Sequence, residues 1–268
     1  MMTGRLANIV PPVLVGIALL ALWEGLVLAL GIQEFLLPRP SSIWASLSEQ
    51  WAGRAETLGT VPLREAGFNT GVIAVTGLIF GVLLGVALAL VAIRFTRLGD
   101  AFTPFAVAVN ATPIVALAPI FNAWFGITGS FSNQAVVLVV VFFPVFINTA
   151  RGLTEVHPDQ LELMRSYAAS EMTILRRVRV PNALPFFLTS LRIAAPLSVI
   201  AAIVAEYFGG PQSRLGPVIT QNASFARYDA AWAAIVVASG IGLGLFILAM
   251  VVERLAMPHK RSSQDRES

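Results

Sequence analysis

The residues that usually carry chemistry are scarce in this chain, and their spacing excludes most catalytic and metal sites. Cysteine is absent, so neither a disulfide framework nor a thiolate metal site can form. The two histidines, His157 and His259, lie far apart in polar segments, which argues against a histidine-based metal site. No G-x-x-x-x-G-K-[ST] motif occurs, so the chain has no P-loop for ATP. The sequence therefore predicts no catalytic residue, no metal and no cofactor in this chain.

One polar segment, residues 164–185 (MRSYAASEMTILRRVRVPNALP), stands between very apolar stretches and carries four arginines and one glutamate. Helix signals begin just before it: Pro158-Asp159 with Glu162 is typical of a capped helix start, and Ser170-Glu171 is a second candidate cap. An apolar stripe at helical spacing is formed by Leu161, Met164, Ala168, Met172, Leu175 and Val178.

These signals predict two short helices joined by a tight bend of small residues and stopped by Pro181 and Pro185. Such a hairpin would present an apolar stripe with a basic rim, which suits docking to a partner better than catalysis. The alternative is an amphipathic connector that lies on the inner leaflet and is held by attraction between arginines and lipid.

The composition shows what must position this segment. Of 268 residues, 56% are hydrophobic and only 12% are charged, whereas soluble domains carry about 25% charge. The mean hydropathy is +0.77. Because the basic residues fall in short clusters beside apolar runs, they indicate membrane orientation and not nucleic-acid binding. The chain is predicted to be an all-α membrane protein.

Six membrane spans of roughly 20 residues each are predicted. They cover about 8–31, 66–93, a stretch ending near 120, 134–150, 186–208 and 229–253, with an outer loop FNAWFGITGSFSN between the third and fourth. Gly77, Gly81 and Gly85 recur at every fourth position, which predicts close helix packing.

A short helix is predicted after the first span. Ser41 or Ser42 would cap it, and its apolar face contains Ile43, Trp44, Leu47 and Trp51. It would lie on the outer surface, and an ordinary connecting helix is the alternative. The expected division is 1–65 for the first span and this helix, 66–255 for the main membrane domain with a cytoplasmic loop at 152–185, and 256–268 for a disordered tail.

The basic residues fix the predicted topology. With both termini in the cytosol, the inner segments hold Arg5, Arg94, Arg97, Arg151, Arg165, Arg176, Arg177, Arg179, Arg254, Lys260, Arg261 and Arg266. The outer segments hold only Arg39, Arg54, Arg64, Arg214 and Arg227. This asymmetry favours six spans with both ends inside.

Polar residues within the spans are candidates for a pathway or a gate. Asn110, Thr112, Asn148 and Ser198 could bond weakly to a passing solute, and helix packing is the equally open alternative. Glu206, near the outer end of the fifth span, is either an interfacial cap or an outer gate. Arg192 is expected to extend toward the inner interface, and Glu24 and Glu253 are expected to be interfacial.

The loop resembles the cytoplasmic signature loop of the integral membrane subunits of bacterial ATP-binding-cassette (ABC) importers. It is most similar to the branch that includes nitrate, sulfonate, taurine and vitamin-precursor permeases. The matching positions are Arg165, Ser166, Ala169, Ser170, Ile174, Arg177, Val178, Arg179, Pro181, Ala183, Leu184 and Pro185. The chain departs where Ala168 replaces the family's usual glycine and where Leu163-Met164 replaces the initial Glu-Ala. Alanine bends within ordinary backbone space, so a tighter or more helical turn is expected there.

The resemblance continues over roughly residues 66–255. Thr112–Pro119 and Trp124–Gly126 resemble the third span and its exit, and Leu191–Ala194, Ala205-Glu206, Gly209 and Leu215-Gly216 resemble the fifth span and its outer loop.

This resemblance implies a type I importer permease in the inner (plasma) membrane of a bacterium. It would carry a vitamin precursor (hydroxymethylpyrimidine- or riboflavin-like) or a nitrate- or sulfonate-type anion. Its partners would be two ATPase subunits that hold ATP and Mg²⁺, an external solute-binding protein, and a second permease copy. The residues implied to contact the ATPase are Met164, Arg165, Tyr167, Ala168, Ala169, Ser170, Glu171, Met172, Leu175, Arg176 and Arg177.

Two other functions stay open on the residues alone. A stand-alone secondary transporter would need an inverted repeat and coupling charges near the midplane, and neither is evident. A membrane-embedded enzyme would need a convergent nucleophile, base or metal set within the spans, and the chain offers none.

Overall fold

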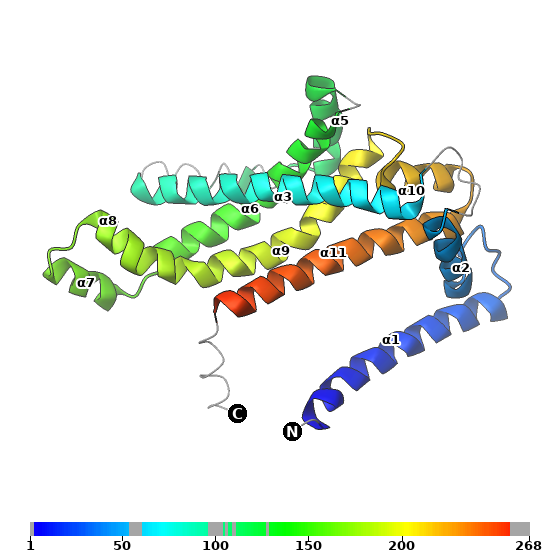
Figure 1. Cartoon of the computed structure of the whole chain (residues 1–268), viewed down its shortest axis with the longest axis horizontal. Coiled ribbons are helices and arrows are strands. Elements are labelled where there is room, and N and C mark those ends of the chain that lie inside the picture. Colours follow the sequence, from blue (N-terminus) through cyan, green and yellow to red (C-terminus); the bar gives the residue numbers. More distant parts are fainter. Residues whose placement is uncertain are drawn as a thin grey trace. The chain divides into compact units, whose positions relative to one another are not determined.

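The computed structural model describes residues 3–53, 61–95, 104, 107–108, 111–126 and 129–257, and every regular element in these ranges is a helix (Figure 1). The elements are α1 (Thr3–Ala29), α2 (Pro40–Trp51), α3 (Leu63–Arg94), α5 (Ile114–Phe125), α6 (Ser130–Thr154), α7 (Pro158–Ser166), α8 (Glu171–Ile174), a π-helical turn (Leu175–Arg179), α9 (Val180–Tyr207), α10 (Leu215–Ser224) and α11 (Tyr228–Ala256). The all-α prediction is confirmed.

Five helices in the described ranges are long and apolar enough to cross a membrane: Val10–Ala29, Leu63–Arg94, Ser130–Thr154, Glu171–Tyr207 and Tyr228–Ala256. They correspond to the first, second, fourth, fifth and sixth predicted spans. Part of the third predicted span, including Asn110, lies outside the described residues, as does the tail beyond 257.

The outer loop predicted over 121–133 is wrong at both ends. Pro113 has an extended, non-helical backbone and is the N-cap of α5. This 12-residue helix then runs through the apolar residues as far as Phe125. Gly126, with a φ of +87°, ends it, and α6 begins at Ser130. Glycine suits this helix end because it adopts backbone angles that the aromatic residues before it disfavour.

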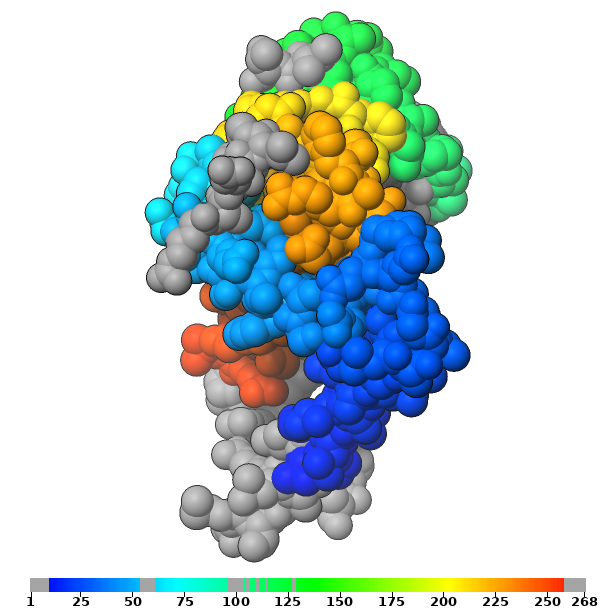
Figure 2. Space-filling view, turned by 90° about the vertical axis from the view of Figure 1, so that its right-hand side faces the viewer, coloured from blue at the N-terminus to red at the C-terminus, as the bar shows by residue number. Residues whose placement is uncertain are grey.

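The described chain forms two compact units. The first contains residues 1–67 and 212–237, and parts of both stretches are visible on the face that Figure 2 shows. Here Glu24 of α1 caps α2, because its carboxylate accepts hydrogen bonds from the Ser41 N–H at 3.0 Å and the Ser41 hydroxyl at 2.7 Å. The predicted serine cap is wrong: Arg39 is the N-cap residue, and its side chain accepts no cap hydrogen bond. A carboxylate suits this place because a helix N-terminus attracts negative charge.

Helix α10 was not predicted. Residues 209–228 read as a loop because they are rich in Gly, Pro and Asn, yet Leu215–Ser224 is helical. Pro217 lies in its first turn, where the missing N–H has no partner to lose. Leu215 and Val218 are buried and provide the apolar face that the polar composition conceals.

The second unit contains residues 68–211 and 238–268, and its core is built on α6 and α9, which pack along each other (Figure 1). Ile73, Val137, Val141, Val145 and Val199 are among the buried residues of the main apolar cluster.

The glycines of α3 bring it close to α6. A Cβ added at Gly77 would lie 2.5 Å from Cβ of Val137, and one at Gly81 would lie 2.9 Å from Cγ1 of Val141. At Gly85 it would lie 3.0 Å from the carbonyl oxygen of Phe142. The predicted packing role of this glycine series is confirmed.

Candidate functional site

The predicted hairpin is present as α7, a bend at 167–170, α8 and the π-helical turn; we refer to residues 158–179 as the hairpin. Figure 1 places it beyond one end of α6 and α9, whereas α5 lies at their other end. Pro158 occupies the first turn of α7, where a proline is well tolerated. The predicted Asp159 cap is wrong, since His157 is the N-cap and Asp159 instead lies 3.4 Å from its Nδ1.

The second predicted cap is confirmed. The Ser170 hydroxyl accepts a hydrogen bond from the Thr173 N–H at 3.3 Å and lies 2.9 Å from the Thr173 hydroxyl. This bond satisfies one of the free N–H groups at the start of α8.

The bend is made by Ala168 in a left-handed conformation, with a φ of +50°. The Ala168 N–H donates to the Arg165 carbonyl at 2.9 Å, and the Ala169 N–H donates to the Met164 carbonyl at 3.0 Å. These two bonds form the Schellman motif that ends many helices, usually with glycine at the left-handed position. The prediction of a tighter or more helical turn at Ala168 is wrong: Ala168 adopts the left-handed backbone typical of glycine, held there by the two bonds.

Replacing Ala168 with glycine should therefore stabilise the hairpin. Left-handed backbone costs an alanine about 1–2 kcal/mol, and the greater chain entropy of unfolded glycine offsets about 0.5–1 kcal/mol of that gain. Hydrogen exchange of the amides in α7 and α8 should slow several-fold in Ala168→Gly. The matched control is Ala169→Gly, at a residue with ordinary φ, which should speed exchange. Faster exchange in Ala168→Gly would contradict the strain argument.

The predicted end of the hairpin at Pro181 is wrong, because the helix continues without interruption from Glu171 to Tyr207. Across the π-helical turn, the Val180 N–H bonds to the Leu175 carbonyl, five residues back. Pro181 has no N–H to donate, and the wider turn leaves room for its ring. The second arm of the hairpin, from Glu171 onward, and the membrane span thus form one continuous helix.

Side chains at the start of α9 bind the end of α6. The Asn182 amide donates to the carbonyls of Gly152 at 2.8 Å and Glu155 at 2.9 Å, and Arg179 donates to the Leu153 carbonyl at 3.2 Å. These bonds satisfy carbonyls that a helix end leaves without partners. A Cβ at Gly152 would lie 2.8 Å from Cα of Ala183, so the two backbones nearly touch. We call Gly152, Arg179 and Asn182 the basal clamp; its role was not predicted from the sequence.

The predicted contact residues divide into an exposed set and a half-buried set. Arg165, Tyr167, Ala168, Ser170, Glu171, Met172, Arg176 and Arg177 are exposed, and Met164, Ala169 and Leu175 are half-buried. Tyr167 is 76% exposed and Met172 is 55% exposed, so large apolar groups face outward at the bend and at the start of α8. We refer to residues 167–172 as the exposed bend. Leu175 packs against the cluster that contains Phe142 and Phe146, and buried Ile174 lies next to it in the chain. Leu175 therefore holds the hairpin to the unit and does not belong to its outer face.

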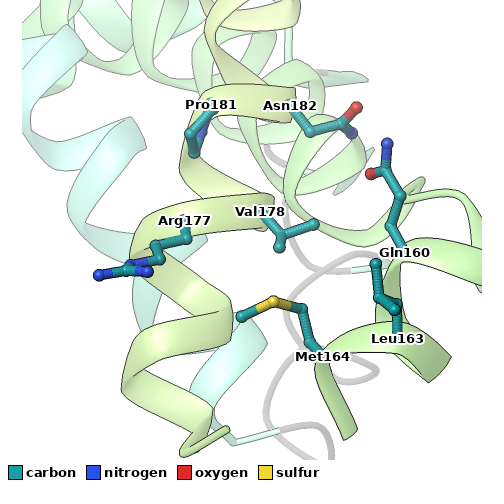
Figure 3. A pocket seen from close by; sticks show the side chains of 7 residues that line it. All are labelled: Gln160, Leu163, Met164, Arg177, Val178, Pro181 and Asn182. Atoms are coloured by element: carbon teal, nitrogen blue, oxygen red, sulfur yellow. The ribbon is translucent and has the colours of Figure 1, made fainter. Parts of the chain in front are cut away.

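A pocket of about 360 Å³ lies between the arms of the hairpin (Figure 3). Its lining residues are Gln160, Leu163, Met164, Arg177, Val178, Pro181 and Asn182. No sequence pattern signals this pocket, because it forms only where α7 turns back toward the first residues of α9.

Three of the four pathway candidates, Thr112, Asn148 and Ser198, lie among the described residues. Ser198 is fully buried and its hydroxyl donates to the Ala195 carbonyl of its own helix at 2.7 Å. The Asn148 amide donates to the Pro144 carbonyl at 2.8 Å, and the Thr112 hydroxyl donates to the Ala108 carbonyl at 3.2 Å. Each of these groups is bonded within its own segment, and their role in translocation stays a prediction. The burial of Ser198 counts against direct contact with a solute in this conformation.

Glu206 is 1% exposed, so it is buried and not interfacial. Its Oε2 accepts a hydrogen bond from the Thr70 hydroxyl of α3 at 3.0 Å. The same end of α9 is held from α5 and α6: the Asn122 amide donates to the Phe208 carbonyl at 3.2 Å, and the Asn133 amide donates to the Gly209 carbonyl at 3.4 Å. Because Asn122 and Asn133 are buried, this polar network fixes the end of α9. The gate role of Glu206 stays a prediction.

Arg192 and Glu253 form an ion pair that the sequence did not reveal, with Nη1 and Oε2 3.3 Å apart. Both were expected to reach the interface separately. The pair joins α9 to the end of α11, and its Arg192 side chain keeps 38% exposure.

Comparison with known proteins identifies the family. The family described as binding-protein-dependent transport system inner membrane component matches residues 77–258. The formylaminopyrimidine transport permease protein ThiX of Halalkalibacterium halodurans is 32% identical over 255 residues, which cover 93% of this chain and 96% of that protein. The riboflavin transport system permease protein RibX of Chloroflexus aurantiacus is 30% identical over 241 residues, covering 88% and 85%.

The fold comparison agrees. A crystal structure described as an amino acid ABC transporter with histidines has a TM-score of 0.58 at 17% identity, covering 72% of this chain and 92% of that chain. The described helices thus have the type I importer permease fold. The family match covers more than half of the chain, and the 32% identity to ThiX extends over nearly the full length of both proteins. This protein therefore belongs to the inner membrane components of binding-protein-dependent transport systems, the permeases of ABC importers.

Proposed function

We propose that this permease forms the translocation pathway for a small solute together with a second copy of itself, and that its hairpin docks onto an ATPase subunit. The supporting observation is the exposed bend, where Tyr167 and Met172 face outward beside Arg165 and Arg176. Exposed apolar groups rimmed by charge are typical of interaction sites. A chain without a P-loop must receive the energy of ATP from another subunit.

The proposed topology has six spans with both termini in the cytosol, which puts the hairpin on the ATPase side. The distribution of basic residues supports this orientation, since Arg165, Arg176, Arg177 and Arg179 all lie in the hairpin. The external solute-binding protein would then approach the end of the second unit that carries α5. As the permease of an ABC importer, the chain is a multi-pass inner membrane protein and is not itself an enzyme.

Replacing Tyr167 and Met172 with aspartate should release the ATPase subunit. Both side chains are exposed, so the change removes apolar contact area without disturbing the core. Loss of two interface anchors costs about 2 kcal/mol or more, which weakens binding by more than tenfold. Co-purification of the ATPase with the tagged permease measures the effect.

The matched control is Phe131→Asp, which makes the same kind of change at a side chain that is 60% exposed in the first turn of α6. It lies at the opposite end of α6 from the hairpin, so ATPase association should be unchanged. Full association of the Tyr167→Asp, Met172→Asp double variant would overturn the docking role of the hairpin.

The proposed substrate is a nitrogen heterocycle of the vitamin-precursor class. The support comes from the two relatives above, whose names state transport of formylaminopyrimidine and of riboflavin. Uptake into proteoliposomes that contain the permease, its ATPase and its binding protein tests this proposal with labelled formylaminopyrimidine, riboflavin and an alkanesulfonate. Uptake of the sulfonate alone would contradict it.

A further inference from the structure

The pocket inside the hairpin lies on the concave side, away from the exposed bend. We propose that it receives one apolar side chain of the ATPase subunit, so that the two subunits interlock in both directions; this rests on the proposed docking of the hairpin. The permease would thus insert its bend into the ATPase and accept an ATPase side chain between its own two arms.

The size and the lining of the pocket support this occupant. Four of its lining residues are apolar, namely Leu163, Met164, Val178 and Pro181 (Figure 3). A volume of 360 Å³ is at the lower limit of ligand sites, which span about 300–1,000 Å³. An open apolar recess of this size suits an anchor residue of a protein interface, because such residues fill pockets at the centre of the contact. Leu163 is still 56% exposed, so a large part of its apolar surface is free to be covered by a partner.

The polar residues that line the pocket indicate which ATPase residues should flank the inserted side chain. Arg177 is exposed and forms no ion pair with any described residue of the chain. Both N–H groups of the Asn182 amide are used on the carbonyls of Gly152 and Glu155, which leaves its Oδ1 as an acceptor. The occupant should therefore be flanked by a carboxylate that pairs with Arg177 and by a donor that reaches Asn182.

The pattern of charge favours a protein over the lipid surface. A segment that binds anionic lipid is a cluster of lysine and arginine. The hairpin instead exposes Asp159 and Glu162 on α7 and Glu171 on α8, near its arginines. These carboxylates would be repelled by an anionic leaflet, whereas a partner protein can present charges of both signs.

Single-cysteine variants test the proposal cleanly because the chain has no cysteine of its own. Leu163→Cys reports on the pocket and Met172→Cys on the exposed bend. In membrane vesicles, co-expression of the ATPase subunit should slow maleimide labelling of both variants by about tenfold or more. Benzophenone-maleimide attached to the thiol of the Leu163→Cys variant should then cross-link to an ATPase side chain upon illumination.

Each other outcome has a definite meaning. Protection at position 172 with free labelling at position 163 would overturn the pocket proposal and leave the docking intact. Free labelling at both positions would overturn the docking as well. Protection at position 163 in vesicles without the ATPase, lost in detergent, would assign the pocket to lipid and overturn the proposal.

A variant whose own side chain fills the pocket distinguishes insertion of an ATPase side chain from simple covering of the pocket by the ATPase. Val178→Phe places a larger apolar side chain into the recess from its own half-buried position. It should weaken ATPase association by about tenfold, while size-exclusion chromatography confirms that the variant is folded. Unchanged association of a folded Val178→Phe variant would show that no side chain enters, and would overturn the proposal.

Discussion

The Gly81→Leu variant should fail to form a stable permease. A Cβ at this position would lie 2.9 Å from Cγ1 of Val141 and 3.0 Å from the Leu138 carbonyl oxygen. The backbone of α6 cannot retreat, because its opposite face packs along α9. Overpacking of a tight core costs about 1–3 kcal/mol for small additions and more when backbone must move, so we expect a loss of at least about 3 kcal/mol. Thermal unfolding of the detergent-solubilised protein measures the loss.

The matched control for this variant is Gly242→Leu in α11. A Cβ at Gly242 meets nothing within 4 Å in the described chain, so the same substitution adds no clash there. Its melting temperature should stay close to that of the unaltered protein. Equal melting temperatures for Gly81→Leu and Gly242→Leu would contradict the close packing of α3 on α6.

The Asn182→Asp variant should bind the ATPase but lose the coupling of ATP hydrolysis to transport. Aspartate has nearly the shape of asparagine but cannot donate, so the carbonyls of Gly152 and Glu155 lose their partners. The bond to Gly152 is partly buried, so leaving that carbonyl without a partner costs about 1–3 kcal/mol, and the basal clamp opens. Stimulation of ATP hydrolysis by the solute-loaded binding protein should fall by about tenfold or more.

Thr154→Val provides the comparison for Asn182→Asp. The Thr154 hydroxyl also bonds to carbonyls at the end of α6, those of Ala150 and Arg151, but within its own helix. Its loss leaves the link between α6 and α9 intact, so stimulation should persist. If Asn182→Asp keeps full stimulation, or if both variants lose it equally, the clamp has no specific part in coupling.

Much of the fold could be predicted because apolar runs and prolines are local signals. The long uncharged run at 66–93 corresponds to α3, and Gly126 marks the end of α5. The same signals misled where tertiary context prevailed. Pro181 reads as a helix stop, yet the π-helical turn before it carries the helix onward. Leu215–Ser224 reads as a loop, yet burial of Leu215 and Val218 stabilises a helix.

The hairpin was predictable in outline, since the Ser170 cap and the small residues before it are local features. Its finer geometry was not. The left-handed backbone of Ala168 depends on two hydrogen bonds that override the preference of alanine. The contacts from Asn182 to Gly152 and from Thr70 to Glu206 join residues 30 and 136 positions apart, and no spacing rule reports such pairs.

The unbroken helix from Glu171 to Tyr207 has a mechanical consequence. Its 37 residues extend for about 55 Å at about 1.5 Å per residue, with the bend of the hairpin at one end and the buried Glu206 at the other. Hydrogen bonds of the basal clamp hold this helix near one end, and those of the Asn122 and Asn133 amides hold it at the far end. A push at the bend therefore acts as torque about the clamp and strains the distant amide bonds. The π-helical turn is the one irregular stretch along its described length, and its stiffness decides how much of that torque is transmitted.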